Sequence, residues 1–177
     1  SLLSPQQIKT LSTVKVVTPE LYDIDGFPVD GGLMDLRLGA IDPGVRCRTC
    51  GKRVKECSGH PGLIELARPV LHIKYIPLIE LCLRSFCPFC GKLTLSEEKQ
   101  HGLSLAQRAK KARDAKRCPY CNEQIERVKL EKPTNFFMNK KRISPIEVRE
   151  RLIKISDDEL KKIGINSITA RPERAVL

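Results

Sequence analysis

The 177-residue chain has no tryptophan, and aromatic side chains make up only 5% of it. Hydrophobic residues still account for 41%, which is typical of a globular protein, but one whose core is aliphatic and thin. A chain of this length folds as one compact domain or as two small ones. We therefore expect a source of stability other than aromatic packing.

Long apolar runs are missing as well. The longest mostly apolar stretch, residues 63–83, is interrupted by four charged side chains, Glu65, Arg68, Lys74 and Glu80. A membrane-spanning helix needs about 20 consecutive apolar residues, so no segment is expected to cross a bilayer. The first ten residues also lack the pattern of a secretory signal peptide.

Sequence signatures of catalysis are absent too. The chain has no Gly-x-x-x-x-Gly-Lys phosphate loop and no Gly-x-Ser-x-Gly nucleophile elbow. Asp23 and Asp25 lack a third carboxylate for a metal site, and their spacing is typical of a turn. We expect His72 to pack within a strand and His101 to lie in a loop. No catalytic residue is predicted.

Charge is strongly one-sided. The sequence has 32 Lys and Arg against 21 Asp and Glu, a net charge of +11 that favours polyanionic partners, above all nucleic acid. Residues 107–117 contain six basic side chains and one acidic one, with Ala106, Ala109 and Ala112 at helical spacing. This pattern predicts a helix with one packed face and one basic face that is either solvated or bound to phosphates. Residues 52–55 have the same two interpretations.

Eight cysteines suggest metal binding. Without an export signal, thiolates in a reducing compartment are favoured over disulfides. Seven of the cysteines and one histidine form two sets of four, built from pairs separated by two residues: Cys47, Cys50, Cys57 and His60, then Cys87, Cys90, Cys118 and Cys121. A two-residue gap lets both side chains of a tight turn reach one tetrahedral zinc ion. Gly51 and Gly59 allow such turns. The remaining Cys82 is expected in the core.

Four protein ligands in each set predict closed, structural sites, because a catalytic zinc keeps one position for water. The sequence therefore predicts two structural Zn²⁺ ions. Each contributes folding free energy on the order of 10 kcal/mol or more in a small module. The zinc knuckles either act as staples alone or also contact nucleic acid.

The fold class is predicted to be α+β, with short helices, short strands and a zinc ribbon. Helix starts are indicated by four capping boxes, which are Ser4 with Gln7, Ser104 with Gln107, Ser144 with Glu147, and Ser156 with Glu159. We expect an apolar helix over 77–85, an edge strand over 64–73 that includes Pro69, and strand-like runs over 92–95 and 124–130. Residues 22–44 read as an ordered loop.

The order of these motifs resembles the N-terminal clamp region of the largest subunit of multisubunit DNA-directed RNA polymerases, in its archaeal form. The landmarks run through nearly the whole chain, at Leu3–Ile8, Tyr22–Pro28, Gly31–Gly39, Ile41–Gly44, both Cys/His sets, Ile64–His72, Leu130–Pro133, Arg149–Leu152 and Ala170–Glu173. Two motifs depart from the family. Asp35-Leu36-Arg37 stands where Asp-Pro-Arg is usual, and Gly59-His60-Pro61-Gly62-Leu63 where Gly-His-Phe-Gly-His is usual.

The resemblance implies a small zinc-stabilised clamp domain that is a fragment of a longer subunit. Residues 1–86 would be the clamp core with the first zinc, 87–130 the zinc ribbon with the second, and 131–177 a helical return segment. The clamp closes over DNA and the DNA–RNA hybrid during transcription. It would be a non-catalytic part of a nucleotidyltransferase, with the Mg²⁺ of the whole enzyme held outside this fragment.

Partners implied by the resemblance are other polymerase subunits, especially the second-largest, together with DNA, the DNA–RNA hybrid, and initiation and elongation factors. No membrane is involved, and the expected location is the cytoplasm, at the nucleoid. Two alternatives come from other classes. One is a free-standing zinc-ribbon adaptor that binds protein or nucleic acid. The other is a zinc hydrolase, which would require an open coordination position.

Overall fold

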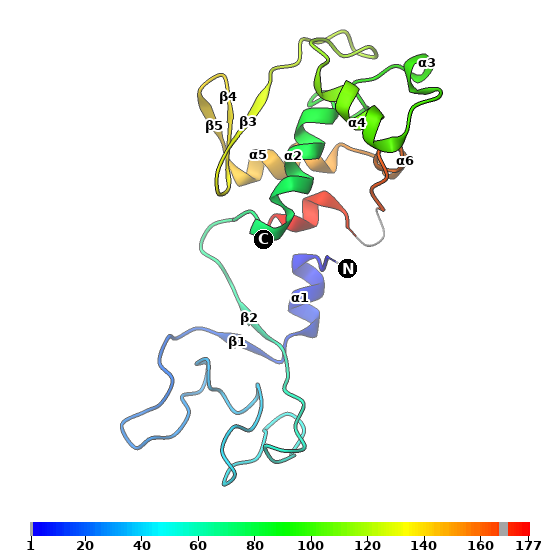
Figure 1. Ribbon diagram of the computed structural model, residues 1–177. Coiled ribbons are helices and arrows are strands. Elements are labelled where there is room, and N and C mark those ends of the chain that lie inside the picture. Colours follow the sequence, from blue (N-terminus) through cyan, green and yellow to red (C-terminus); the bar gives the residue numbers. More distant parts are fainter. Residues whose placement is uncertain (1, 167–169) are drawn as a thin grey trace. The chain divides into compact units, whose positions relative to one another are not determined.

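The structure is a computed structural model that describes residues 2–166 and 170–177 (Figure 1). The chain forms two compact units. The N-terminal unit comprises residues 3–67, and the C-terminal unit comprises residues 68–177 together with Leu2. No helix in the described part combines the length and the apolar character needed to cross a membrane. The functional division at 86/87 and 130/131 stays a prediction.

The N-terminal unit has little regular structure. Helix α1 (Pro5–Leu11) begins with a complete capping box: Gln7 N–H donates to Ser4 Oγ, and Ser4 N–H donates to Gln7 Oε1. Strands β1 (Val14–Val16) and β2 (Gly62–Ile64) pair in parallel. Gly62 lies close to the Leu38 side chain, because a Cβ atom would lie 2.7 Å from Leu38 Cδ2 and would displace it. The predicted ordered loop occupies most of the intervening chain.

The strand predicted over 64–73 is wrong beyond its first residue. Strand β2 ends at Ile64, and only Leu71 pairs further on, in an isolated bridge with Val176. Pro69 has no N–H to donate, and residues 64–70 are exposed, so no sheet face is buried there. His72 lies outside a strand. Its Nδ1 accepts from Lys74 N–H and caps the 3₁₀ helix η1 (Ile73–Tyr75).

The C-terminal unit consists of short helices with one small sheet at its side, next to α2 (Ile76–Ser85) and α5 (Pro145–Ile153) (Figure 1). Strands β3 (Val128–Glu131), β4 (Asn135–Met138) and β5 (Lys141–Ile143) form an antiparallel sheet in that order. The other helices are α3 (Glu97–Gln100), α4 (Leu105–Arg113), α6 (Asp157–Lys161) and the 3₁₀ helix η2 (Pro172–Ala175). Helix α2 packs against α4, α5, β3 and η2, so it is the centre of the unit. The α+β class is confirmed.

All members of the main hydrophobic cluster belong to the C-terminal unit. The cluster is largely aliphatic, as predicted, and its aromatic members are Phe86 and Phe136. Helix α2 contributes Ile79 and Cys82, both 0% exposed. The prediction for Cys82 is therefore confirmed. Burial raises the pKa of its thiol to about 12, which keeps the thiol neutral.

Three of the four predicted capping boxes are complete, at Ser4, Ser104 and Ser144. The fourth is only half formed. Ser156 Oγ accepts from Glu159 N–H, but the Glu159 carboxylate does not accept from Ser156 N–H. It accepts instead from Leu93 N–H at 2.7 Å and from Lys162 Nζ at 2.6 Å. Glu159 thus ties α6 to the segment around Leu93.

The strands expected beside the second cysteine set are shorter than predicted. Phe86 and Leu93 form one isolated bridge, and Arg117 and Gln124 form another. A continuous ladder begins only at Val128, in β3. After Leu93, the Thr94 hydroxyl turns inward and contacts the carbonyls of both Ser85 and Ala112 at 2.9 and 2.7 Å. That inward turn takes residues 94–95 into the core and away from a sheet.

Candidate metal centres

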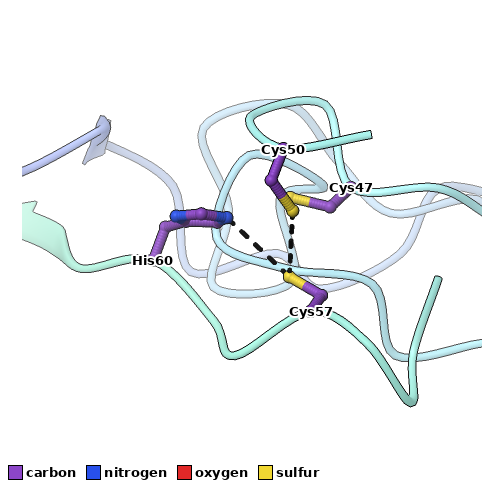
Figure 2. Close-up of side chains that lie close together, drawn as sticks. All are labelled: Cys47, Cys50, Cys57 and His60. Carbon is purple, nitrogen blue, oxygen red and sulfur yellow. Dashed lines mark hydrogen bonds between the residues drawn. The ribbon is translucent and has the colours of Figure 1, made fainter. Parts of the chain in front are cut away.

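The first Cys/His set converges on one point in the N-terminal unit (Figure 2). Its four ligand atoms all lie within 4.8 Å of one another. Cys50 Sγ lies 3.6 Å from Cys57 Sγ, which lies 3.8 Å from His60 Nε2. A tetrahedral zinc with bonds of about 2.0 to 2.3 Å separates its ligand atoms by roughly 3.3 to 3.8 Å. The residues that the sequence grouped therefore fit such an ion.

The second set converges in the same way in the C-terminal unit. Cys87 Sγ lies 3.6 Å from Cys121 Sγ, and Cys90 Sγ lies 3.6 Å from Cys118 Sγ. All four sulfurs lie within 4.8 Å of one another. A disulfide would require a separation of about 2.05 Å, and all eight cysteines are free thiols. Two groups are thus present, each able to hold a metal ion.

Packed helices bring the second set together across the intervening chain. Helix α2 ends at Ser85, two residues before Cys87, and α4 ends at Arg113, shortly before Cys118. These two helices pack against each other. Packing of α2 against α4 therefore positions both Cys-x-x-Cys knuckles. The candidate metal centre lies at the ends of these two packed helices.

The three Cys-x-x-Cys knuckles share one backbone turn. In each, the first cysteine N–H donates to the carbonyl five residues later, and an N–H four residues later donates back to the cysteine carbonyl. The residue after the second cysteine has a positive φ, which is 72° at Gly51, 71° at Gly91 and 57° at Asn122. This turn points both sulfurs to one side. At Gly91 a Cβ would also lie 2.2 Å from the Lys154 carbonyl oxygen.

The pair Cys57 and His60 is held differently, by contact with a neighbouring loop. Gly59 between them has φ +82°, and His60 N–H donates to the Leu38 carbonyl at 2.7 Å. The same loop also holds the first knuckle, since Arg48 N–H donates to the Leu36 carbonyl at 2.9 Å. Residues 36–38 therefore position ligands from both halves of the first centre.

A buried carboxylate organises that loop. Asp35 is 1% exposed and accepts from Gly31 N–H, from Arg37 N–H and from the Arg37 guanidinium. The Arg37 side chain, together with these backbone bonds, holds the pKa of Asp35 well below its usual range, although burial opposes the shift. Sequence reasoning missed this role. The available signal was the Asp-x-Arg spacing, which survives although the middle residue departs from the family pattern.

The thiols of the two centres differ in their electrostatic setting. Burial opposes ionisation of Cys47, but the backbone N–H groups of Cys50 and Thr49 outweigh it and lower the pKa of Cys47 to about 6. At Cys87 burial dominates and raises the pKa to about 12. Because metals bind the thiolate, metal binding at Cys87 must release a proton near neutral pH.

The other candidate residues lie outside both centres. Asp23 forms the predicted turn, with Oδ1 accepting from Asp25 N–H and Phe27 N–H. His101 is exposed in a turn after α3. Neither residue joins a group of potential metal ligands among the described residues. Lys52, Arg53 and Lys55 are exposed beside the first centre.

The predicted basic helix is α4, and its packed face is shorter than expected. Ala109 and Ala112 are buried in the core, but Ala106 is exposed because the first turn of α4 lies outside the core cluster. Arg108, one of the six basic side chains of this segment, is half-buried rather than fully exposed on the basic face, and its Nε donates to the Leu103 carbonyl at 3.1 Å.

Comparison with known proteins identifies the family. The model of the family RNA polymerase Rpb1, domain 1 matches residues 1–177. DNA-directed RNA polymerase subunit Rpo1N of Methanothermobacter thermautotrophicus is 44% identical over 99% of the chain and 22% of its own length. The subunits of the same name from Methanocaldococcus jannaschii and Sulfolobus acidocaldarius are 43% and 37% identical over 99% of the chain and over 15% and 22% of their own lengths.

The chain therefore spans about a fifth or less of the length of these relatives. The landmarks that carried the resemblance extend from Leu3 to Glu173, and the family match covers the same span. The chain belongs to the RNA polymerase Rpb1, domain 1 family, and corresponds to the N-terminal part of the largest polymerase subunit.

Proposed function

We propose that the chain is the N-terminal portion of a mobile polymerase clamp that closes over DNA and the DNA–RNA hybrid during transcription. The observation that carries this proposal is the family match over all 177 residues, and it is supported by two groups of four Cys and His side chains that could each hold a metal ion. The relatives are subunits of DNA-directed RNA polymerase. In the assembled enzyme the clamp would contact other subunits, above all the second-largest, and receive initiation and elongation factors at the nucleoid in the cytoplasm.

The proposed metal content is two Zn²⁺, with Cys47, Cys50, Cys57 and His60 as ligands of the first and Cys87, Cys90, Cys118 and Cys121 as ligands of the second. Sulfur-rich donor sets with tetrahedral spacing favour zinc over magnesium or calcium, which prefer oxygen. Four protein donors complete each coordination sphere. The metals therefore supply folding free energy and rigidity rather than an activated water.

The fragment's proposed role is mechanical, with the nucleotidyl-transfer Mg²⁺ bound by a later part of the subunit. Rigid-body motion requires a stiff element. The C-terminal unit has a continuous core, and its metal centre joins the ends of α2 and α4. Both features support a body that moves as a unit.

Charge supports a nucleic-acid partner. Residues 3–67 contain eight basic and eight acidic side chains, so their formal charges cancel. The other 24 basic and 13 acidic side chains belong to the C-terminal unit, which thus carries the whole net charge of +11. Such an excess attracts phosphates without reading base sequence.

Fluorescence energy transfer in a reconstituted polymerase tests the clamp proposal. One dye is placed on an exposed residue of the C-terminal unit, such as Lys99, and the other on the second-largest subunit. We expect transfer to increase when template DNA and an RNA primer are added. Unchanged transfer, or a chain that fails to assemble with the other subunits, would instead favour the free-standing adaptor. Atomic absorption should give two zinc ions per chain.

A further inference from the structure

We propose that a groove between the end of α4 and the start of β3 binds the sugar–phosphate backbone of nucleic acid. This inference rests on the proposed function, because it names where a nucleic acid would contact the chain. The α4–β3 groove has a volume of about 290 Å³. It is lined by Leu83, Arg84, Arg113, Asp114, Ala115 and residues 125–129, all within the C-terminal unit.

The walls of the groove are fixed by hydrogen bonds. Arg84 Nε donates to the Val128 carbonyl at 2.9 Å, which joins α2 to the first residue of β3. Ile125 N–H donates to the Lys116 carbonyl at 2.9 Å, which joins the chain after α4 to the chain before β3. The second metal centre holds Cys118 and Cys121 within this same loop. The groove is therefore preformed, and metal binding braces one of its sides.

Unpaired cations rim the groove. Arg113, Arg127 and Lys129 are exposed, and none of them has a carboxylate within 4.0 Å among the described residues. By contrast, Arg84 pairs with Glu80 at 2.8 Å and serves the fold. The surrounding residues 108–129 hold eight basic and three acidic side chains. Positive charge is thus concentrated here, because this segment has five more basic than acidic side chains.

The lining selects for phosphate rather than for bases. It includes no aromatic side chain on which a base could stack. Its aliphatic residues Leu83, Ala115, Ile125 and Val128 are buried or half-buried and form its floor, whereas the cations Arg113, Arg127 and Lys129 are exposed at its rim. An apolar floor with a cationic rim suits a sugar–phosphate strand, and the contact would not depend on base sequence. Duplex DNA and single-stranded RNA both present this chemistry.

Two carboxylates also line the groove, and substituting them gives a second, independent test of the proposal. Asp114 and Glu126 are exposed and have no ion-pair partner among the described residues. Each would repel a phosphate bound between Arg113 and Lys129. Neutralising them should therefore strengthen binding at this groove, a gain that loss of folding cannot imitate.

The test measures binding of the chain to a fluorescent duplex DNA and to a single-stranded RNA across a salt series. The loss variant is Arg113→Gln/Arg127→Gln/Lys129→Gln. Its control, Lys74→Gln/Lys99→Gln/Arg149→Gln, removes the same charge from exposed positions outside the groove. The gain variant is Asp114→Asn/Glu126→Gln, with Glu98→Gln/Glu150→Gln as its control. Zinc content and circular dichroism verify folding.

Each lost phosphate contact lowers the slope of log affinity against log salt by about 0.9 on duplex DNA and about 0.7 on single strands. We expect the loss variant to reduce the magnitude of this slope by roughly two to three on the polymer that the groove binds. The control should reduce it by less than one. The gain variant should bind more tightly than its own control. The polymer with the larger change identifies the source of the phosphates.

If each variant and its control have equal effects, the α4–β3 groove is not the binding site. Binding of nucleic acid elsewhere on the chain would still stand. If the unaltered chain binds neither polymer at low salt, the groove and the nucleic-acid contact in the proposed function both fail.

Discussion

The two units of the chain solve the problem of stability in different ways. The C-terminal unit buries a continuous cluster of apolar side chains around α2. The N-terminal unit buries only Val14, Ala40 and Cys47 among its described hydrophobic residues, together with the charged Asp35. We infer that the two candidate metal centres contribute differently to stability. A metal ion in the first would replace a missing core, whereas one in the second would add to a core that already exists.

The two units also differ in net charge. The N-terminal unit has no net formal charge, and the C-terminal unit carries +11. The unit with its own core is thus also the one suited to hold nucleic acid. We infer that a stiff, basic body and a metal-dependent, neutral one perform different tasks in the polymerase.

The largest expected effect is the loss of a ligand from the first centre. Cys47→Ser should release one metal ion and unfold the N-terminal unit, because a structural zinc contributes on the order of 10 kcal/mol. Cys118→Ser, an equally buried ligand at 1% exposure, should release the other ion and loosen only its surroundings. Hydrogen exchange followed by mass spectrometry compares residues 3–67 with α2 and α5. Global unfolding by Cys118→Ser would erase the contrast between the units.

A core truncation should act on the C-terminal unit alone. Ile79 is 0% exposed in α2, and Ile79→Ala should lower the free energy of unfolding by about 2 to 5 kcal/mol. Ile24 is fully exposed at 101%, so Ile24→Ala should leave stability unchanged. Urea unfolding of the metal-loaded chain gives both values. Faster hydrogen exchange throughout residues 3–67 in Ile79→Ala would show that the N-terminal unit depends on this core.

Removing the charge of Asp35 should lower the stability of the N-terminal unit, but by less than the loss of a metal ligand. Asp35→Asn weakens bonds to the Arg37 guanidinium and should cost about 2 to 3 kcal/mol at pH 7. Since folding lowers the pKa of Asp35, the carboxylate stabilises above its unfolded pKa of about 3.9. That contribution is lost as the pH falls below this value. Chemical unfolding of the metal-loaded proteins at pH 7 compares their free energies of unfolding, and equal values would refute this assignment.

The smallest expected effect concerns helix caps. Ser104→Ala removes a complete capping box from α4 and should cost about 1 kcal/mol. Ser156→Ala is the control at α6, where the bond runs in one direction only and Glu159 is held elsewhere. We expect the smaller loss there. Thermal unfolding of the two variants compares them, and a larger loss for Ser156→Ala would reverse the predicted order.

Local signals predicted much of this molecule. The two ligand groups follow from cysteine spacing, since a Cys-x-x-Cys turn fixes both sulfurs through bonds within six residues. The helix starts at Ser4, Ser104 and Ser144 are local in the same sense. That Cys82 is buried followed from its apolar neighbours.

The failures involve contacts between distant residues. The alternation over 64–73 resembled a strand, but a strand needs a partner, and β1 offers only three residues. Glu159 matched a capping box, yet it contacts Leu93, 66 positions away. The role of Asp35 was not predicted because it depends on a loop whose Leu38 carbonyl accepts from His60 N–H. No local sequence pattern indicates that contact.

Exhaustive chelation followed by hydrogen exchange tests most directly whether metal replaces a core in the N-terminal unit. With both ions removed, amides of residues 3–67 should exchange as in an unfolded chain, while those of α2 and α5 keep most of their protection. Persistent protection in β1 and β2 after complete metal removal would contradict the role assigned to the first centre.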